Sequence, residues 1–582
     1  MTKKTFLKLS ACSLILGVAA TGFTTSAQAQ AIPTQLQPAQ GTIDPSRLED
    51  QFQQDTVIPD LGEAVEVQRA IIQNAPANAD QIKFELNNIS IEGVGAYSAE
   101  QLQSIYGNQL GTTVSLADVY SIANRLTTKY RNDGFILTQV VVPPQTIDDG
   151  NVVLRVVEGY VDRVVIEGVD EEDSELSRIR SYASKVSTGD ALNLKQLERA
   201  LLLINDLPGV SARSVLSPSS SQAGASDLRI IVSRKDYDAL LGVDNFGSRY
   251  LGAVQLTASG AANSIVFDNN EQITGQFVTA PFGNTHYELA FGALSYEQPI
   301  NSYGTKARAF LSHSDTEPGY DIDIFNVKGK STTYGFGLEH PIIRSRTQNL
   351  YANAQVDFRD VNSRSDIDVT RDDHIRALRL GARYEFIDTL FGVGINSIDV
   401  EASKGMNILG ASDEGDANLT RPNGDPQFAK LNVSAQRLQR ITSDVNLLLG
   451  VNVQESNNAL LSSEEFGVGG ASFGRGYDAS EIVGDDGYST KVELQWSNPI
   501  DTSLSAVENY NVYGFWDFGK VTNDDATISD DDESLSSVGA GVRANLSNNF
   551  EAGFYVALPL TRDVQTRDDQ DPRYFFNLSR RF

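Results

Sequence analysis

Apolar and polar residues alternate along most of the C-terminal part of the chain, from about Tyr237 onward. In one segment Leu350, Ala352, Ala354, Val356 and Phe358 are apolar, and Asn353, Gln355 and Asp357 lie between them. A period of two predicts β-strands with one apolar and one polar face. At about 20 to 22 residues for each strand and its connection, about 345 residues would form about 16 antiparallel strands, an even number as in bacterial barrels.

The alternation leaves the environment of these strands open, because a soluble β-sandwich or propeller has the same pattern. After the first 29 residues the chain contains no run of about 18 apolar residues that could cross a bilayer as a helix. A closed barrel is the other structure that satisfies every backbone hydrogen bond in hydrocarbon. We therefore expect a transmembrane β-barrel over residues 237–582, with lipid outside and water inside.

The last residues favour the membrane barrel. Tyr574, Phe576 and Leu578 alternate with polar residues, and the chain stops on the aromatic Phe582. Arg580 interrupts the pattern near the end of the strand, where a long side chain can reach the interface. We expect the four apolar residues to belong to the closing strand and to act as a barrel assembly signal, although a soluble C-terminal strand has the same pattern.

Residues 1–29 have the pattern of an export signal. Lys3, Lys4 and Lys8 precede an apolar stretch from Leu14 to Phe23, and small residues follow at Ala27 and Ala29. Cys12 is the one cysteine of the chain, and the apolar stretch follows it, which disfavours a lipoprotein signal. The mature protein is therefore expected to contain no disulfide.

Residues 30–82 form a predicted linker, rich in Gln, Ala, Pro and Asp and poor in apolar anchors. Two short amphipathic patches interrupt it, around Arg47–Gln54 and around Leu61–Ile72. We expect one or two short helices there.

The pattern changes to compact α/β structure at Lys83. A strand around Phe84–Ile91 is followed by two helix starts, at Ser98 and at Ser115, and then by two more strands, Phe135–Val142 and Val152–Val157. The resulting order β-α-α-β-β recurs in the next segment. We therefore predict two tandem domains at residues 83–159 and 160–236, each of about 75 residues. One larger α/β domain is the alternative.

Charge and motifs exclude several classes of function. The formal net charge of −29 disfavours nucleic acid as a partner, because a phosphate backbone would be repelled. The sequence contains no Ser nucleophile in a G-x-S-x-G turn and no Gly-rich phosphate loop before a helix. Its four histidines lack the spacing of a metal site. We therefore expect no enzymatic activity, no metal and no cofactor.

One glycine-dense segment has the features of a tightly folded loop. In chain order it contains Gly469, Gly470, Arg475, Gly476, Tyr477, Gly484 and Asp485. Glycines at this density let a backbone turn sharply and approach other groups closely. Arg475 would then be a cation held in a fixed place.

A candidate partner for this cation lies in the aromatic strand that contains Phe515, Asp517 and Gly519. Asp517 falls on the same face as Phe515. A carboxylate on the inner wall of a barrel can hold a guanidinium by two parallel hydrogen bonds. The alternative is a loop arginine without a partner, which would contribute less than about 1 kcal/mol.

Several motifs, in this order and spacing, resemble one family. They are Pro144-Gln145 with Gly150, Val157-Glu158-Gly159, Asn205-Asp206-Leu207-Pro208-Gly209, Asp244-Asn245-Phe246-Gly247 with Gly252, Gly469-Gly470, Arg475-Gly476-Tyr477, Gly484-Asp485, the F-x-D-x-G at Phe515, Asp517 and Gly519, and Gly539-x-Gly541. Together they resemble the outer-membrane transporters of two-partner secretion, the haemolysin secretion/activation proteins. The resemblance covers nearly all of residues 83–582. The chain departs from the family at Gly474, where an apolar residue is usual before the arginine.

The resemblance implies a 16-stranded barrel in the Gram-negative outer membrane, preceded by an N-terminal plug helix and two periplasmic POTRA domains. Such proteins export one large β-helical partner, often an adhesin or haemolysin, without nucleotide hydrolysis. By the same resemblance, Arg475 lies at the tip of a loop folded back into the lumen, with Asp517 as its partner on the wall. The barrel assembly machinery would be a further partner.

Two other functions remain open at this point. A barrel of the same superfamily that inserts other membrane proteins has the same parts, but usually with more POTRA domains. A secreted β-rich binding protein or hydrolase with accessory α/β domains would show the same alternation of residues.

Overall fold

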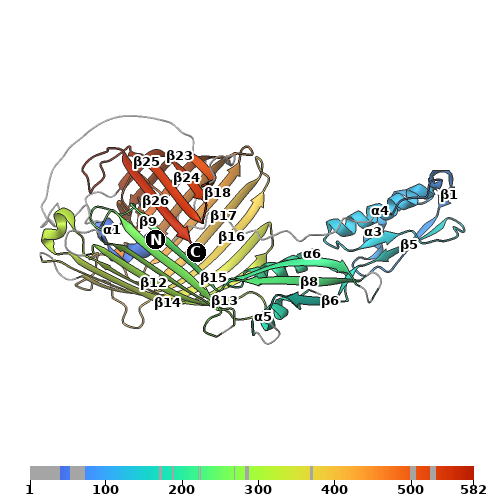
Figure 1. Ribbon diagram of the computed structural model, residues 1–582, viewed down its shortest axis with the longest axis horizontal. Coiled ribbons are helices and arrows are strands. Elements are labelled where there is room, and N and C mark those ends of the chain that lie inside the picture. Colours follow the sequence, from blue (N-terminus) through green and yellow to red (C-terminus); the bar gives the residue numbers. More distant parts are fainter. Residues whose placement is uncertain are drawn as a thin grey trace, which may run out of the picture.

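The computed structural model describes residues 40–52, 73–169, 174–186, 189–219, 222, 225–267, 269–281, 287–366, 371–498, 506–524 and 532–582. The predicted export signal with Cys12 and the patch around Leu61–Ile72 lie outside the described residues. A barrel and an arm of two smaller α/β units follow one another along the longest axis of the molecule (Figure 1).

Sixteen strands form one closed antiparallel barrel. Each pairs with the next barrel strand along the chain, and the last pairs with the first to close the ring. The strands are β9 (Tyr237–Asp244), β10 (Gln255–Asn263), β11 (Gln272–Ala280), β12 (Leu289–Pro299), β13 (Lys306–Thr316), β14 (Lys328–Arg344), β15 (Gln348–Arg364), β16 (Arg371–Asp388), β17 (Gly394–Gly405), β18 (Ala429–Arg440), β19 (Val445–Ser456), β22 (Asp486–Asn498), β23 (Val507–Thr522), β24 (Asp532–Leu546), β25 (Phe550–Pro559) and β26 (Arg573–Arg581). The predicted number of strands is therefore confirmed.

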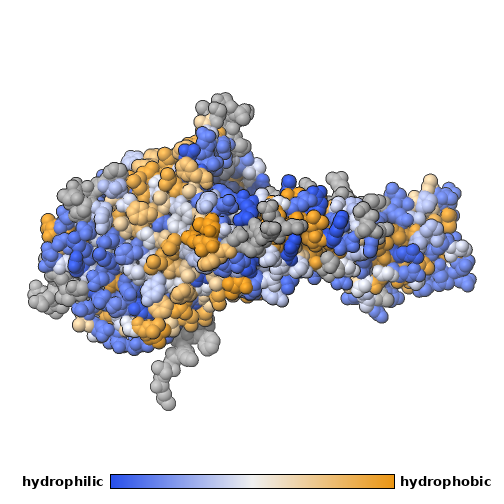
Figure 2. Space-filling model, turned by 60° about the horizontal axis from the view of Figure 1, so that its bottom comes forward, coloured by the Kyte–Doolittle hydropathy of each residue, from blue (hydrophilic) through white to orange (hydrophobic). Residues whose placement is uncertain are grey.

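The outer face of the barrel is apolar. Along β14, Tyr334, Phe336 and Leu338 are exposed, and Phe336 keeps 65 % of its surface accessible, whereas Thr333, on the opposite face, is buried. Figure 2 shows a hydrophobic band across the barrel, with hydrophilic residues beyond it. A water-soluble sandwich would bury such a surface. The alternation therefore means lipid outside, as expected for a transmembrane barrel.

The two ends of the barrel differ in the length of their connections. The end next to the arm has short turns, such as residues 345–347 and 441–444. The opposite end has longer loops, such as residues 406–428 and 457–485. Outer-membrane barrels place short turns in the periplasm and long loops outside the cell.

The unit farther from the barrel comprises β1 (Lys83–Leu86), β2 (Asn88–Glu92), α3 (Ala99–Gln103), β3 (Thr112–Ser115), α4 (Leu116–Asn132), β4 (Gln139–Val141) and β5 (Asn151–Val157). Strands β2, β5 and β4 form its main sheet, and β1 pairs with β3. Both predicted helix starts are capping boxes, at Ser98 and at Ser115. Val119, Ile122 and Leu126 of α4 are fully buried in the core of this unit.

Two strands of this unit are shorter than predicted. The strand expected around Phe84–Ile91 divides into β1 and β2, which belong to different sheets. The strand expected from Phe135 is limited to Gln139–Val141. A turn precedes it, in which the Thr138 N–H donates to the Phe135 carbonyl. Ile136 in this turn packs into the core of the next unit.

The unit next to the barrel comprises β6 (Tyr160–Glu167), α5 (Ser174–Ala183), α6 (Leu194–Asn205), β7 (Val210–Pro218) and β8 (Ala225–Arg234). Its sheet has the order β6-β8-β7, and its core is distinct from that of the first unit. Two separate sheets and cores favour two tandem domains over one larger α/β domain. Ile136 and Leu137 nevertheless join the two units, because they pack against the second core.

The N-terminal described segment lies inside the barrel rather than beside it. It comprises α1 (Gln40–Ile43), the 3-10 turn η2 (Pro45–Arg47) and α2 (Leu48–Phe52). Leu48 is buried against Leu251 and Phe291 of the barrel, and Ser314 of β13 donates to the Pro45 carbonyl at 2.6 Å. Of all helices in the described part of the chain, not one has the length and apolarity needed to cross a membrane.

Candidate functional site in the barrel lumen

The long connection between β19 and β22 folds back into the barrel. It contains a 3-10 turn η6 (Ser462–Glu464) and a small hairpin of β20 (Phe466–Val468) and β21 (Ile482–Gly484). At its tip the Tyr477 N–H donates to the Gly474 carbonyl at 2.9 Å, which closes a turn around Arg475. We refer to residues 457–485 as the lumenal loop.

Arg475 and Asp517 form a two-pronged ion pair. Arg475 Nη2 lies 2.8 Å from Asp517 Oδ1, and Nε lies 2.9 Å from Oδ2. The backbone N–H of Arg475 donates to the same carboxylate at 3.0 Å. Asp517 is fully buried and Arg475 is 5 % exposed. The predicted partners therefore meet, with the parallel geometry that fixes a guanidinium in one orientation.

A second carboxylate, which the sequence analysis missed, also holds Arg475. Glu493 of β22 accepts a hydrogen bond from Arg475 Nη1, and its other oxygen accepts one from Arg543 Nη1 of β24 at 2.8 Å. The guanidinium carbon of Arg475 lies 3.6 Å from the centre of the Phe515 ring, so the ring makes a cation–π contact with the guanidinium. Two anions and two cations thus alternate in one chain of contacts, which joins Arg475 of the lumenal loop to β22, β23 and β24.

The tip of the loop is also tied to the closing strand. Arg573 of β26 donates to Asp478 at 2.6 Å and to the Gly476 carbonyl at 3.2 Å. Tyr477 is buried, and its hydroxyl donates to the Ser536 carbonyl at 3.2 Å. Neither Asp478 nor Arg573 belongs to the motifs that identified the loop, and only the closed barrel brings them together.

Two glycines have specific reasons to lack a side chain. Gly474 has a φ of +88°, and a Cβ there would lie 2.9 Å from Leu535 Cδ1. Its departure from the family pattern therefore suits the left-handed backbone of this turn. Gly519 faces the hairpin of the lumenal loop, where a Cβ would lie 2.4 Å from Val468 Cγ1. The absence of a side chain at Gly519 thus lets the hairpin pack closely against the barrel wall.

The remaining loop residues of the predicted site lie around the hairpin. Gly469 follows β20 and its N–H donates to the Phe473 carbonyl, while Gly470 donates to Tyr477. Gly484 ends β21, and the buried Asp485 accepts hydrogen bonds from Arg421 and from the Leu460 N–H. Asp485 therefore fastens the base of the loop to residues 406–428, a role that its place in the motif did not indicate.

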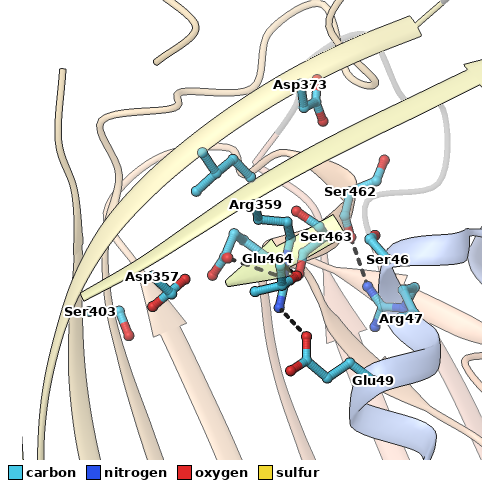
Figure 3. Close-up of polar contacts among 12 residues, drawn as sticks. Ser46, Arg47, Glu49, Asp357, Arg359, Asp373, Ser403, Ser462, Ser463 and Glu464 are labelled. Carbon is cyan, nitrogen blue, oxygen red and sulfur yellow. Dashed lines mark hydrogen bonds and ion pairs between the residues drawn. The ribbon is translucent and has the colours of Figure 1, made fainter. Parts of the chain in front are cut away.

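Arg47 ties the N-terminal segment to both legs of the lumenal loop, and Figure 3 shows its contact with Ser462 on one leg. Arg47 donates to the Ser462 carbonyl at 2.8 Å and to the Glu465 carbonyl at 3.2 Å on one leg. It donates to Ser480 Oγ at 3.0 Å on the other. One side chain thus bridges residues that are far apart along the loop.

A buried charge cluster surrounds Glu464, which the sequence analysis also missed. Arg379 of β16 binds both Glu464, at 2.8 Å, and Asp357 of β15. Lys430 of β18 lies 2.8 Å from Glu464. Figure 3 shows Arg359 between Glu464 and Glu49 of α2, with 3.5 Å between Arg359 and Glu49. The wall, the lumenal loop and the N-terminal segment share this cluster.

A cavity of about 640 Å³ lies between these parts. Its lining includes Glu49 and Phe52 from the N-terminal segment, Ser472 from the lumenal loop, and Arg308 and Gln355 from the wall. Polar and charged groups of both signs face it, which suits water or a peptide backbone better than an apolar ligand.

The four apolar residues of the closing strand face away from the lumen. Tyr574, Phe576, Leu578 and Phe582 are all exposed on the outer surface, whereas Phe575 points inward and stacks on Tyr555. Strand β26 pairs with β9 between Asn577 and Arg581, and the Phe582 N–H donates to the Ala239 carbonyl at 2.8 Å. This strand is therefore positioned to complete the seam.

Deleting Phe582 is expected to reduce the amount of folded barrel several-fold, because the seam would lose about 1–2 kcal/mol of apolar contact and strand pairing. Heat-modifiable mobility of outer-membrane protein on a gel measures the folded fraction. Tyr574→Leu, which keeps an apolar side chain, serves as the control. Equal amounts of folded barrel with and without Phe582 would contradict this role.

Two family models match the chain. The model described as haemolysin secretion/activation protein ShlB/FhaC/HecB matches residues 224–544, more than half of the chain. The model described as POTRA domain, ShlB-type, matches residues 84–159, which is the first α/β unit.

Individual proteins agree with this result. The chain is 24 % identical over 508 residues to the heme/hemopexin transporter protein HuxB of Haemophilus influenzae, covering 84 % of this chain and 86 % of that protein. It is 22 % identical over 512 residues to the outer membrane transporter CdiB of Dickeya dadantii, covering 84 % of each. The solved structure of CdiB from Escherichia coli superposes with a TM-score of 0.71 at 20 % identity, covering 96 % of this chain and 100 % of that one.

The barrel and the α/β structure that precedes it thus agree with the family match. The chain belongs to the haemolysin secretion/activation family, the outer-membrane transporters of two-partner secretion.

Proposed function

We propose that this transporter captures one large, unfolded β-helical protein, of the adhesin or haemolysin type, in the periplasm and conducts it through the barrel to the cell surface. The observation that carries the proposal is a closed barrel whose polar lumen holds an N-terminal segment and a folded loop, attached to one another and to the wall. Segments held by polar contacts can be displaced by an extended chain that offers equivalent hydrogen bonds.

Capture is assigned to the two α/β units, here called POTRA1 (residues 83–159) and POTRA2 (residues 160–236). Each has a three-stranded sheet with two edge strands, β2 and β4 in POTRA1 and β6 and β7 in POTRA2. An extended chain binds readily by adding a strand to a sheet edge, and the main-chain hydrogen bonds make little demand on its sequence. These edges therefore suit a substrate that arrives unfolded.

Transport needs a source of free energy other than nucleotide hydrolysis. A large β-helix buries much apolar surface when it folds, and this free energy becomes available only outside the cell. Folding after exit makes backward movement of the chain unfavourable. We assign the direction of transport to this step.

In the resting state we assign the N-terminal segment the role of a plug. Its contacts with the lumenal loop and with Arg359 support this role. The lumenal loop, fixed by Arg475 and Asp517, would then be the element against which the plug closes.

Co-expression with candidate partners tests the proposal. Cells that carry this transporter and its cognate β-helical protein are expected to release that protein into the medium, whereas cells without the transporter retain it. Purified transporter in lipid vesicles should also form an ion-conducting pore. Release of the partner without the transporter, or absence of any pore in vesicles, would contradict the proposal.

A further inference from the structure

POTRA2 contacts the barrel along its short-turn end, where α6 lies close to the ends of β13 to β15 (Figure 1). Arg199 of α6 donates to the Pro341 carbonyl of β14 at 2.8 Å. Leu203 of α6 borders Gly304, in the turn between β12 and β13. Nζ of Lys185 lies 4.5 Å from the centre of the Tyr303 ring in the same turn. Polar and apolar contacts of α6, and a cation–π contact from the segment just after α5, thus hold POTRA2 against neighbouring turns.

A two-pronged ion pair between Arg344 and Asp206 connects the barrel to POTRA2 at this junction, which we call the joint. Arg344, the last residue of β14, lies 2.8 Å from Asp206 Oδ2 through Nε and 2.7 Å from Oδ1 through Nη2. The Arg344 side chain is 4 % exposed and that of Asp206 is 24 % exposed. A parallel, nearly buried pair is directional, unlike an exposed pair on a flexible surface.

The barrel holds Arg344 in place for this contact. Its Nη1 donates to Asn349 Oδ1 of β15 at 3.1 Å, and Asn349 Nδ2 donates to Glu385 of β16 at 3.1 Å. Three consecutive strands therefore fix the guanidinium. Little side-chain entropy remains to be lost when Asp206 binds.

Asp206 is placed where an acid does not help its own helix. It is the C-cap residue, directly after α6, and lies at the negative end of the helix dipole. The preceding Asn205 has a different task, since its side chain bonds both backbone groups of Ala212 in β7. The carboxylate of Asp206 is thus explained by its contact with the barrel and not by the stability of POTRA2.

We propose that Asp206 and Arg344 are positioning residues, which lock POTRA2 to the periplasmic mouth of the barrel so that a captured chain is delivered at a fixed place. The proposal rests on the proposed function for its effect on secretion, but the joint itself can be measured without a substrate. Fixing POTRA2 also fixes POTRA1, because Ile136 and Leu137 of POTRA1 pack into the POTRA2 core.

Spin labels measure the joint directly. One label is placed at Gln196→Cys, exposed on α6, and the other at Asp444→Cys, exposed in the turn between β18 and β19. In the otherwise unaltered transporter we expect a narrow distribution of label distances, and Asp206→Asn or Arg344→Gln should broaden it. Secretion of the partner should fall about fivefold, at the lower end of usual coupling energies between sites.

A matched control is available within POTRA2. Arg229 and Glu167 form a two-pronged pair of the same type, at 2.9 and 2.7 Å, in the sheet and not at the barrel. Arg229→Gln, on the central strand β8 and not on an edge strand, should leave both the label distances and secretion unchanged. Heat-modifiable mobility confirms that each variant barrel is folded.

The outcomes separate the two proposals. Label distances that stay narrow in both Asp206→Asn and Arg344→Gln would overturn the joint, and so would a broad distribution in the unaltered protein. A transporter with narrow distances that secretes no partner would instead contradict the proposed function.

Discussion

Arg475→Ala and Asp517→Ala are each expected to leave the barrel inserted in the membrane but to lower secretion of the partner about tenfold. Either change leaves a buried charge without its partner, for which the usual cost is about 3–5 kcal/mol. Since Arg475 also binds Glu493, its loss releases the loop tip from two strands, β22 and β23. The barrel retains its backbone pairing, and the loop is expected to lose its fixed position. Secreted partner in the medium, relative to folded transporter, measures the effect.

Arg475→Lys sharpens this experiment. Lysine keeps the positive charge but cannot make two parallel hydrogen bonds to Asp517 or cover the Phe515 ring in the same way. We expect an intermediate loss of secretion, which would show that geometry matters in addition to charge.

Lys520→Ala on the same strand is the matched control. Lys520 pairs with Asp532 at 2.7 Å, but both side chains are more than a third exposed. Exposed pairs contribute about 0–1 kcal/mol, so secretion should not change. If Arg475→Ala and Asp517→Ala behaved like Lys520→Ala, the lumenal ion pair would have no role in transport.

Arg47→Ala is expected to raise the time that the pore spends open by at least tenfold. The change removes three hydrogen bonds that a charged group makes to the two legs of the lumenal loop. Each such bond contributes about 1.5–3 kcal/mol, and 1.4 kcal/mol already changes an equilibrium tenfold. Single-channel recording of purified transporter in planar bilayers measures open time directly.

Gln51→Ala provides the comparison for this variant. Gln51 belongs to the same short helix and lines the same cavity as Arg47. It should change the open time little, because the truncated side chain is neutral. Equal open times for Arg47→Ala and the unaltered protein would show that the N-terminal segment does not close the pore through this residue.

Local sequence patterns were sufficient to predict the secondary structure of the main parts. A period of two forces alternate residues to opposite faces, so the strand content and the shared face of Phe515 and Asp517 followed from local order alone. The family resemblance implied that this face is the inner wall. Ser98 and Ser115 also marked helix starts from local sequence, because a capping box involves only two residues that are three positions apart. The motif around Arg475 then indicated the family before any contact was known.

Which charges meet inside the barrel depends on the three-dimensional fold and could not be predicted from local patterns. Across the β22 and β23 pair, the residue opposite Asp517 is Lys491 and the residue opposite Phe515 is Glu493. The loop nevertheless brings Arg475 to both Asp517 and Glu493. Alternation fixes the face on which a side chain lies, but closure and tilt of the barrel fix its neighbours across the lumen.

The same reason explains the contacts of Arg47, Asp206 and Arg573. Their partners are Ser480, Arg344 and Asp478, each remote in the chain. No local periodicity encodes such pairs, because they depend on where a plug, a domain or a loop docks as a whole. The sequence therefore determined which faces are polar, and the closed barrel determined which polar groups hold one another.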